Sequence, residues 1–546
     1  MKKLIFLYSV ALLILFSNCQ TMKQKADLLI YNGKIYTLDS ISSMAEAMAV
    51  KDGKIIALGT REEIQKKYQG EEQMDVMGKA IFPGFIDAHC HFYGMAQNLQ
   101  YVDLTGSQSF EEVLFRLNSF QLVLEDGWIV GRGWDQNLWE KKEFPNRQML
   151  DKAYPDRPVM LIRVDGHTVL ANQLALKKAG IGMNNSFRPG EVGIRNGILS
   201  GILSEKAADL MRNTVPIPDK QGMKNLLMKA QELCFSCGLT GVSDAGLEFP
   251  VVKLLDSLQQ QGVLKIHVYA MLSPSPENIN EYVLKGIYRT DQLSVSSIKL
   301  YADGSLGSRT ALMKQPYSDA AGGKGILVTS PDSIKKYCQI ALASHYQVNT
   351  HCIGDSAVKL VLEIYGSMLK GKNDHRWRIE HAQVVDPADI GLFGKFSVIP
   401  SVQCTHATSD MLWAEKRIGK ERIRGAYAYK ALLRENGWLP NGTDFPIEQI
   451  SPLLTFYAAV ARKDLKGYPE KGFQTENAIS REEALKSITI WAARANFDDR
   501  IMGSLEVGKQ ANLVILDKDI MTIPIMDVPK TRVLKTIIRG EVMYAQ

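Results

Sequence analysis

Short apolar runs alternate with longer amphipathic stretches through the middle of the chain. Runs with the length and composition of buried strands occupy residues 81–87, 239–243, 264–271, 297–301, 347–350, 377–380, 397–403 and 437–442. Helical periodicity separates several of them, as at 223–235, 333–344 and 357–369. This alternation is typical of βα units and predicts an α/β protein whose strands form a (β/α)8, or TIM-like, barrel over residues 80–499.

The two ends of the chain show a different pattern, in which short apolar runs are joined by turns. Near the N-terminus, Asp52-Gly53 is a hairpin signal between two such runs. Near the C-terminus, runs at 511–517, 533–538 and 541–544 repeat the pattern. We expect residues 25–79 and 500–546 to form one small discontinuous β-sandwich, with the barrel inserted between its two halves.

The stretch from about 100 to 220 is too long for a single crossover between barrel strands. It contains strand-like runs of its own at 128–131 and 159–164. We therefore expect an inserted subdomain after the first barrel strand, lying beside the active site and contributing to the substrate pocket.

The first 19 residues have the pattern of an export signal. Lys2 and Lys3 precede an apolar run at 4–16, which is too short to span a bilayer. The run ends in Phe16-Ser17-Asn18-Cys19, which resembles a bacterial lipobox in which Cys19 carries the lipid. Ordinary secretion with an incidental cysteine is the alternative. We expect a periplasmic or cell-surface protein that reaches a membrane only through its lipid anchor.

The amino-acid composition indicates which kinds of partner the protein binds. The 546 residues are 45% hydrophobic and 23% charged, which is ordinary for a globular protein, and the net charge of +6 is small. Lys and Arg do not cluster with aromatic residues, so we expect no nucleic-acid partner. The cysteines do not suggest a disulfide framework in a chain of this length. The Cys234-x-x-Cys237 pair predicts packed or exposed thiols, with a metal or redox role as the alternative.

Metal-binding residue types stand at the ends of several predicted strands. His89 and His91, two residues apart on one strand, project to the same side, whereas Cys90 between them points to the opposite face. Asp87 shares the side of the histidines and is placed to orient a ligand. The candidate ligands are His89, His91, Lys299, His351, His381 and Asp444. Each histidine alone has a structural alternative, and Asp444 alone has a capping one. The ends of barrel strands, however, converge on one site.

These motifs resemble the amidohydrolase superfamily. The resemblance rests on Asp-x-His-x-His after the first strand, Lys on the fourth, His on the fifth and sixth, and Asp on the eighth. Residues 298–311 (IKLYADGSLGSRTA), 350–357, 376–385 and 426–448 are similar to the YtcJ-like branch, which includes N-substituted formamide deformylases. The similarity covers nearly the whole chain after the signal segment. Cys404 departs from the pattern, because proline is expected after Gln403, and this puts the loop after the seventh strand in question.

The resemblance implies a centre with two divalent metal ions, most simply zinc, with iron or manganese as alternatives. His89 and His91 would bind the more buried ion, and His351 and His381 the more exposed one. Lys299 would bridge both as a carbamate; an unmodified lysine would imply a single ion. Asp444 would bind the buried ion, take a proton from the metal-activated hydroxide as it attacks a carbonyl, and pass that proton to the leaving nitrogen.

Further residues are candidates for binding substrate, and each could instead have a purely structural role. His167 lies in the insertion and is otherwise a turn residue. Arg309 would hold an acidic group or anchor a loop. His406 and Asp410 follow the seventh strand, and Trp134 is either a wall of the pocket or part of a hydrophobic core.

The leading hypothesis is a metal-dependent hydrolase of a non-peptide C–N bond, such as an amide, an N-formyl amine or a cyclic amide. A ring deaminase would use the same site. A catalytically inactive lipoprotein that binds small molecules is the alternative from another class, because a fold alone does not imply catalysis. The partners that we expect are a small-molecule substrate and, at the family level, a second copy in a homodimer.

Overall fold

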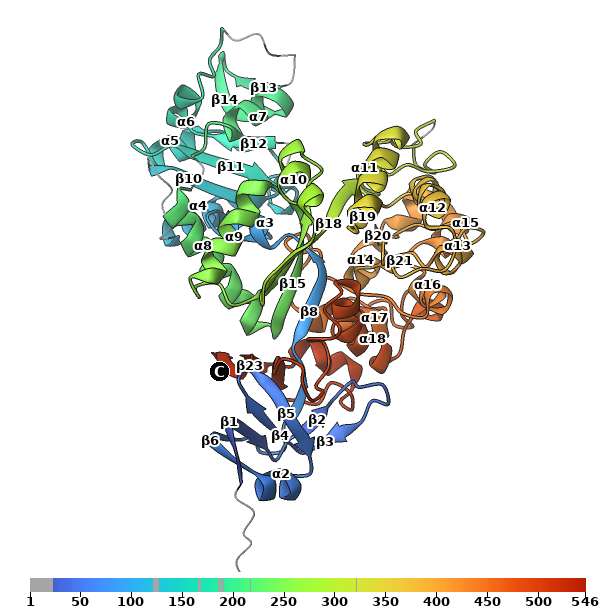
Figure 1. The fold of residues 1–546 in the computed structure, drawn as a ribbon. Helices are drawn as coiled ribbons and strands as arrows, with labels where there is room; N and C mark the ends of the chain where they lie inside the picture. The colour runs from blue at the N-terminus through green and yellow to red at the C-terminus, as the bar shows by residue number, and fades with distance from the viewer. Residues whose placement is uncertain are drawn as a thin grey trace, which may run out of the picture. The chain divides into compact units, whose positions relative to one another are not determined.

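The computed structural model describes residues 23–120, 127–164, 168–184, 187, 191–216, 218–320 and 322–546. The chain divides into two compact units (Figure 1). The insert is Tyr93–Ala230, and the barrel unit combines the residues up to Phe92 with Gln231–Gln546. The predicted signal segment with Cys19 and the candidate His167 lie outside the described residues. No helix within the described ranges is long and apolar enough to cross a membrane.

Parallel strands in chain order form the predicted barrel. Their order is β8 (Phe85–Cys90), β15 (Leu239–Leu247), β16 (His267–Leu272), β18 (Leu293–Tyr301), β19 (Gln347–Cys352), β20 (Arg378–His381) and β21 (Ile399–Ser401). A short strand, β17 (Tyr288–Arg289), pairs antiparallel with β18. Each parallel strand overlaps one of the runs predicted from the sequence. Such runs mark barrel strands because a parallel sheet covered by helices buries both faces of its strands.

Helices lie between and after these strands (Figure 1). They are α8 (Lys220–Ser236), α9 (Phe249–Gln260), α10 (Pro276–Glu281), α11 (Pro331–Ala343), α12 (Asp355–Leu369), α13 (Gly391–Phe396), α14 (Cys404–Asp410), α15 (Ala414–Arg422), α16 (Tyr429–Asn436), α17 (Pro452–Ala461), α18 (Arg481–Ser487) and α19 (Ile490–Ala495). The helices predicted at 223–235, 333–344 and 357–369 correspond to α8, α11 and α12. Ser330 caps α11 by accepting a hydrogen bond from the backbone N–H of Ser333.

The eighth strand predicted at 437–442 is wrong as a regular strand. Only Asn441 forms a bridge, parallel to Val402. The barrel nevertheless closes here, through backbone hydrogen bonds on both sides of the segment 440–445. Gly442 N donates to Val402 O at 2.9 Å, and Asp444 N donates to His89 O at 2.8 Å. Extended pairing stops because Asp444 adopts a left-handed φ of 61°. We call residues 440–445 the closing segment.

The first predicted strand, 81–87, is two strands that belong to different sheets. β7 (Ala80–Pro83) pairs with strands of the terminal sheets, and only β8 enters the barrel. The break falls at Gly84, where a Cβ atom would lie 2.4 Å from Thr240 Oγ1. Residues 80–83 are therefore part of the terminal sheets, four residues beyond the boundary expected from the sequence.

The two ends of the chain combine in a pair of sheets. The four-stranded sheet has the order β5 (Lys54–Gly59), β4 (Ala47–Lys51), β1 (Gln24–Tyr31) and β6 (Tyr68–Asp75). The six-stranded sheet has the order β24 (Glu541–Ala545), β23 (Val533–Ile538), β22 (Leu513–Leu516), β7, β2 (Lys34–Tyr36) and β3 (Met44–Ala45). One buried cluster includes Ile30 and Met48 from one sheet and Leu513 and Ile537 from the other, so both chain ends share a core. Helix α2 (Arg61–Lys67) begins at a Thr60–Glu63 capping box.

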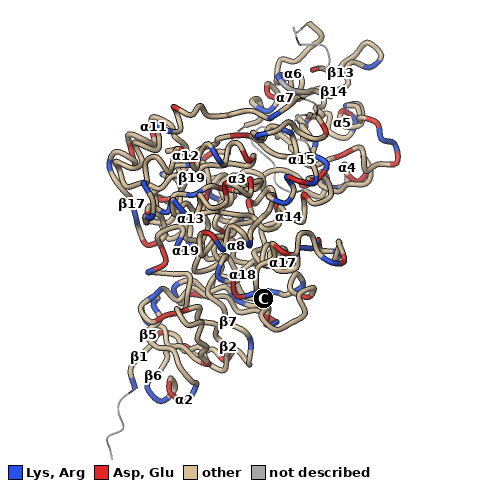
Figure 2. The backbone as a smooth tube through the Cα atoms, turned by 90° about the vertical axis from the view of Figure 1, so that its right-hand side faces the viewer, with Lys and Arg blue, Asp and Glu red and all other residues tan. Residues whose placement is uncertain are grey.

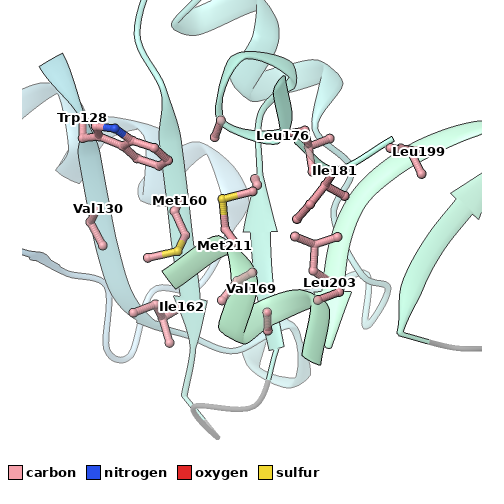
Figure 3. Close-up of a cluster of buried hydrophobic side chains, with 14 residues drawn as sticks. Trp128, Val130, Met160, Ile162, Val169, Leu176, Ile181, Leu199, Leu203 and Met211 are labelled. Atoms are coloured by element: carbon pink, nitrogen blue, oxygen red, sulfur yellow. The ribbon is translucent and has the colours of Figure 1, made fainter. Parts of the chain in front are cut away.

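The insert has a sheet and cores of its own. The strand order is β13 (Val192–Arg195), β14 (Ile198–Ser204), β12 (Thr168–Ala171), β11 (Val159–Arg163), β10 (Ile129–Trp134) and β9 (Val102–Asp103). Its helices include α4 (Phe110–Ser119), α5 (Gln148–Ala153), α6 (Gln173–Lys178) and α7 (Glu205–Arg212), and α3 (Phe92–Asn98) begins at the boundary between the units. Figure 3 shows one core, in which Trp128, Met160, Val169, Leu203 and Met211 pack together. Basic and acidic residues are interspersed along the backbone (Figure 2), in keeping with the small net charge.

Candidate metal centre

The carboxyl ends of the barrel strands bring all of the predicted ligands together. His89 and Lys299 lie within β8 and β18, His351 within β19, His381 ends β20, and Asp444 lies in the closing segment. The ring centroids of His89 and His381 are 4.9 Å apart, and those of His351 and His381 are 4.6 Å apart. Parallel strands of one barrel end at the same rim, and this topology makes residues up to 355 positions apart in the sequence (89 to 444) neighbours.

His89 and His91 both face Asp444, as their spacing on a strand predicts. Asp444 Oδ1 lies 3.3 Å from His91 Nε2 and 3.8 Å from His89 Nε2. His91 Nδ1 is 3.1 Å from the carbonyl oxygen of Ala245. Cys90 points to the other face, where its Sγ lies 3.5 Å from Ser243 O. The alternation of side chains along β8 thus separates the thiol from the imidazoles.

Lys299 is buried beside the first histidine. Its Nζ lies 3.1 Å from His89 Nε2 and 4.9 Å from the centre of the Tyr301 ring. Burial lowers the pKa of Lys299 to about 8, although Glu380 and Asp444 act in the opposite direction. The lysine nitrogen therefore lies beside the ring nitrogen of His89 that faces Asp444.

His351 and His381 are the other two predicted histidine ligands. His351 Nε2 is 3.2 Å from Gly304 O, and His381 Nδ1 is 2.7 Å from Gln403 Oε1. Burial lowers the pKa of His351 to about 3 and that of His381 well below its usual value. Both imidazoles are therefore neutral at neutral pH, and a neutral imidazole is the form that binds a metal.

Glu380 is a functional candidate that the sequence reasoning missed. Its Oε2 lies 2.6 Å from His89 Nδ1, and both side chains are fully buried. Strand alternation would place Glu380 and His381 on opposite faces of β20, and only His381 was among the predicted ligands. His381 adopts a left-handed φ of 73°, which breaks the alternation and lets consecutive residues face the same centre. The acidic residue directly before a candidate ligand was the available signal.

Asp444 is held in place by the residue before it. Thr443 Oγ1 donates to Asp87 Oδ2 at 2.7 Å, and Thr443 N lies 3.1 Å from both oxygens of Asp87. Asp87 also accepts a hydrogen bond from His89 N at 3.0 Å. Asp87 therefore ties the closing segment to β8, rather than contacting an imidazole ring as expected. Burial raises the pKa of Asp444, but the neighbouring imidazoles, His406 and His91 foremost, outweigh it and hold the pKa well below its usual value.

The donor set fits a divalent cation. Among the described residues, His89, His91 and Asp444 form one group whose ligand atoms lie within 4.8 Å of one another, and His381, His406 and Asp444 form a second. One buried carboxylate oxygen of these groups, Asp444 Oδ1, has no hydrogen-bond partner within the described part of the chain. An unpaired buried carboxylate oxygen is costly, and a cation would satisfy it. Imidazole nitrogen and carboxylate oxygen suit zinc, iron and manganese.

Two substrate candidates follow the seventh strand. His406 lies next to Asp444 in the metal centre, whereas the carboxylate of Asp410 is hydrogen-bonded to other protein groups. His406, in α14, has Nε2 3.5 Å from Asp444 Oδ2 and Nδ1 3.0 Å from Glu448 Oε1. Burial opposes the charge on His406, but Asp444 and Glu448 raise its pKa to about 10. Asp410 accepts hydrogen bonds from Gln383 Nε2 and Tyr427 Oη, both at 2.8 Å. Burial raises the pKa of Asp410 to about 6.

The remaining substrate candidates have structural contacts instead. Arg309 forms a two-pronged ion pair with Asp319, with both hydrogen bonds at 2.9 Å, which favours the loop-anchor alternative. Trp134 is 1% exposed in the core of the insert, and its Nε1 donates to Leu161 O at 3.0 Å, which favours the core alternative.

Cys404, which stands where the family pattern has proline, begins α14, and its N–H donates to Asn441 Oδ1 at 3.0 Å. A proline at position 404 would lack this bond to the closing segment.

A parallel barrel with imidazoles, a buried lysine and a carboxylate at the carboxyl ends of its strands defines the class of metal-dependent hydrolases. Residues 72–544 match the model of the Amidohydrolase family. The chain belongs to the amidohydrolase family, and it is a hydrolase that acts on carbon–nitrogen bonds other than peptide bonds.

Relatives of known sequence confirm the resemblance to the YtcJ-like branch. The putative amidohydrolase YtcJ of Bacillus subtilis (strain 168) is 29% identical over 526 residues, which cover 94% of this chain and 98% of that protein. The N-substituted formamide deformylase of Arthrobacter pascens is 26% identical over 556 residues, covering 96% and 99%. A solved structure, an uncharacterized metal-dependent hydrolase from Pyrococcus horikoshii OT3, superimposes with a TM-score of 0.78 at 30% identity, covering 91% and 99%.

Proposed function

We propose that this enzyme hydrolyses the C–N bond of an N-formyl or other N-acyl amine, with a cyclic amide as the related alternative. The observation that carries the proposal is the convergence of imidazoles and Asp444 at one rim of the barrel, with Asp444 Oδ1 left without a hydrogen-bond partner in the described chain. The similarity to an N-substituted formamide deformylase along almost its entire length supports this substrate class. The complete set of ligand residues also argues against an inactive scaffold, which would have no need to assemble them.

We propose two divalent cations, most simply zinc, with His89, His91, His351, His381 and Asp444 among their ligands and Lys299 as a carbamate. Lys299 Nζ lies 3.1 Å from His89 Nε2. As an ammonium it would repel a cation bound by His89, whereas a carbamate supplies carboxylate oxygens. Cations held there would act as Lewis acids toward the substrate carbonyl and promote formation of hydroxide from water at neutral pH.

Asp444 is the residue that we propose moves the proton. The neighbouring imidazoles keep it ionised, and its Oδ1 has no hydrogen-bond donor among the described residues, so that oxygen can accept a proton from the attacking water. A C–O bond forms at the carbonyl carbon, and the C–N bond then breaks. The proton on Asp444 Oδ1 passes to the leaving nitrogen, and the products are the free amine and a carboxylic acid.

Asp444→Asn tests this role. The amide keeps the size of the side chain and one oxygen donor but cannot take the proton, so we expect kcat for an N-substituted formamide to fall by at least about 10²-fold. Metal content, measured by elemental analysis, should stay largely intact. Near-normal turnover by the variant would exclude Asp444 as the proton acceptor. Asp332→Asn is the matched control, because the side chain of Asp332 is 96% exposed, away from the centre.

We also propose that the enzyme is exported and anchored to a bacterial membrane through Cys19. The support is the sequence pattern of residues 1–19, which precede the described chain. The active site would then act on small molecules outside the cytoplasm.

A further inference from the structure

Every imidazole at the centre has one ring nitrogen bound to a fixed acceptor. The Nδ1 atoms of three predicted ligands face acceptors: His89 faces Glu380 Oε2 at 2.6 Å, His91 faces Ala245 O at 3.1 Å, and His381 faces Gln403 Oε1 at 2.7 Å. In His351 it is Nε2 that faces an acceptor, Gly304 O, at 3.2 Å. Histidines that bind a metal typically donate their second ring N–H in this way, which fixes the tautomer and leaves the other nitrogen free to bind.

His406 shows the same arrangement, although the sequence suggested only a substrate contact. Its Nδ1 lies 3.0 Å from Glu448 Oε1, and Glu448 is itself held by a hydrogen bond of 2.6 Å from Ser409 Oγ. The side chain of His406 is 13% exposed. With the proton on Nδ1, the lone pair of Nε2 points toward Asp444 Oδ2 at 3.5 Å.

Two lone pairs that face each other across 3.5 Å repel unless a positive charge lies between them. In the metal-free chain a second proton on His406 supplies that charge, and a cation shared with Asp444 would displace this proton. The neighbouring groups favour the cation, because His381 completes a group of three ligands with His406 and Asp444.

The two oxygens of Asp444 face different histidines. Oδ1 faces His89 and His91, and Oδ2 faces His406. A carboxylate in this position can bind one cation through each oxygen, so the group with His406 is separate from the group with His89 and His91 but joined to it through Asp444.

We propose that His406 is a metal ligand: His406 Nε2, His381 and Asp444 Oδ2 hold the second divalent cation, and Asp444 bridges the two cations. The inference rests on the proposed metal-dependent function and adds a ligand that the comparison with the family did not suggest. Glu448 is then a positioning residue that fixes the tautomer of His406.

Metal stoichiometry tests the proposal. The wild-type protein without residues 1–19 and the His406→Ala and His406→Gln variants are each dialysed against zinc without chelator, and bound zinc is measured by elemental analysis. We expect about two zinc ions per wild-type chain and about one in both variants. The matched control is His375→Ala, because His375 lies outside the centre. Circular dichroism identifies any variant that fails to fold, and His406→Gln keeps the size of the side chain if alanine does not.

Proton NMR of the Co²⁺-substituted protein provides a second readout that a merely structural role would not change. Each ligating imidazole contributes one strongly shifted, exchangeable N–H signal, and we expect the His406 signal to be present in the wild type and absent in both variants. Two zinc ions in the variants, or no shifted signal from His406, would overturn the proposal while leaving the proposed function intact. A folded wild-type protein that binds none of zinc, iron and manganese would instead refute the proposed function.

Discussion

At the scale of single residues, burial sets the charge of the centre. Desolvation lowers the pKa of His351 to about 3, and the same cause lowers the pKa of His381. Neutral imidazoles need an acceptor for their N–H group, since a buried polar group without a partner is costly. Glu380, Gln403 and backbone carbonyls supply these acceptors. The metal centre therefore depends on the residues that orient the imidazoles as well as on the imidazoles themselves.

Glu380→Gln tests this dependence on a single acceptor. The amide keeps the shape but removes the charge that fixes the His89 N–H, so we expect the affinity for zinc to fall by about 10- to 100-fold. Competition with a chromogenic chelator measures the dissociation constant. Glu363→Gln on the exposed face of α12 is the control and should bind zinc as the wild type does. Equal affinity in both variants would show that Glu380 does not orient His89.

At the scale of elements, the closing segment joins the two edges of the barrel without forming a strand. It is hydrogen-bonded to Val402 on one side and to His89 and His91 on the other. Its close approach to β8 requires a residue without a side chain at Gly442, where a Cβ atom would lie 2.5 Å from His89 N and 2.6 Å from Asp87 Oδ1. The position of Asp444 therefore depends on this glycine.

Gly442→Ala should disturb both stability and metal binding. The neighbouring atoms are backbone and a buried carboxylate that cannot move away, so we expect the free energy of unfolding to fall by about 1–3 kcal/mol. Urea denaturation measures this change, and elemental analysis should show reduced zinc. Gly391→Ala is the control, because a Cβ atom at Gly391 would meet nothing within 4 Å. A Gly442 variant as stable as this control would contradict the proposed close packing.

Helices α16 and α18 are joined by an ion pair that predicts a pH dependence. Lys430 Nζ lies 2.6 Å from Glu483 Oε1, and Glu483 also completes the capping box of α18 with Ser480. Burial acts against the charge, but the bonds from Lys430 and Ser480 lower the pKa of Glu483 below its usual value. A lowered pKa contributes stability above the unfolded-state value of about 4.3, and this contribution is lost as the pH falls through the folded-state value.

Glu483→Gln should therefore destabilise the protein at pH 7 by roughly 0.5–1 kcal/mol, with a shrinking difference from wild type as the pH falls below about 4. Urea unfolding at several pH values measures the difference. Glu421→Gln, at a highly exposed position, should change little. A difference between Glu483→Gln and wild type that does not vary with pH would show that the ion pair is not its origin.

At the scale of the whole molecule, the chain order and the spatial order differ. Strands β1 and β23, near the two ends of the described chain, share the core of the terminal sheets, and the barrel lies between them in the sequence. The insert interrupts the barrel after β8 and has separate hydrophobic clusters on its own sheet. Each unit thus buries its own apolar surface, which is what allows a long insertion within one barrel.

The proposed anchor belongs to this scale, because it concerns where the intact protein resides. We expect Cys19→Ser to move the enzyme from the membrane fraction to the soluble fraction of the cell. Immunoblotting of fractionated cells expressing the full chain measures the distribution, and Cys237→Ser is the control, since it lies outside the signal segment. An unchanged membrane fraction for Cys19→Ser would mean that Cys19 is not lipidated.

Much of the fold followed from periodicity, and the misjudged places have local causes. The strand predicted at 264–271, for example, was found as β16 because buried parallel strands are short and rich in apolar residues. The eighth strand and the single first strand were wrong. The left-handed backbone of Asp444 ends the pairing of the closing segment, and Gly84 allows a close approach to Thr240 at the break between β7 and β8. No apolar pattern reveals either feature. Glu380 and Glu448 were missed because their partners are distant in the sequence.

The sequence by itself determined the class of fold, the family and the candidate ligands, because hydrophobic period and residue type are local properties of the chain. Only the tertiary structure decided which nitrogen of each histidine is free, which carboxylate oxygens lack partners, and that His406 faces Asp444. Those properties depend on distances between segments that the barrel brings together. They also depend on burial, which changes the cost of every unpaired charge.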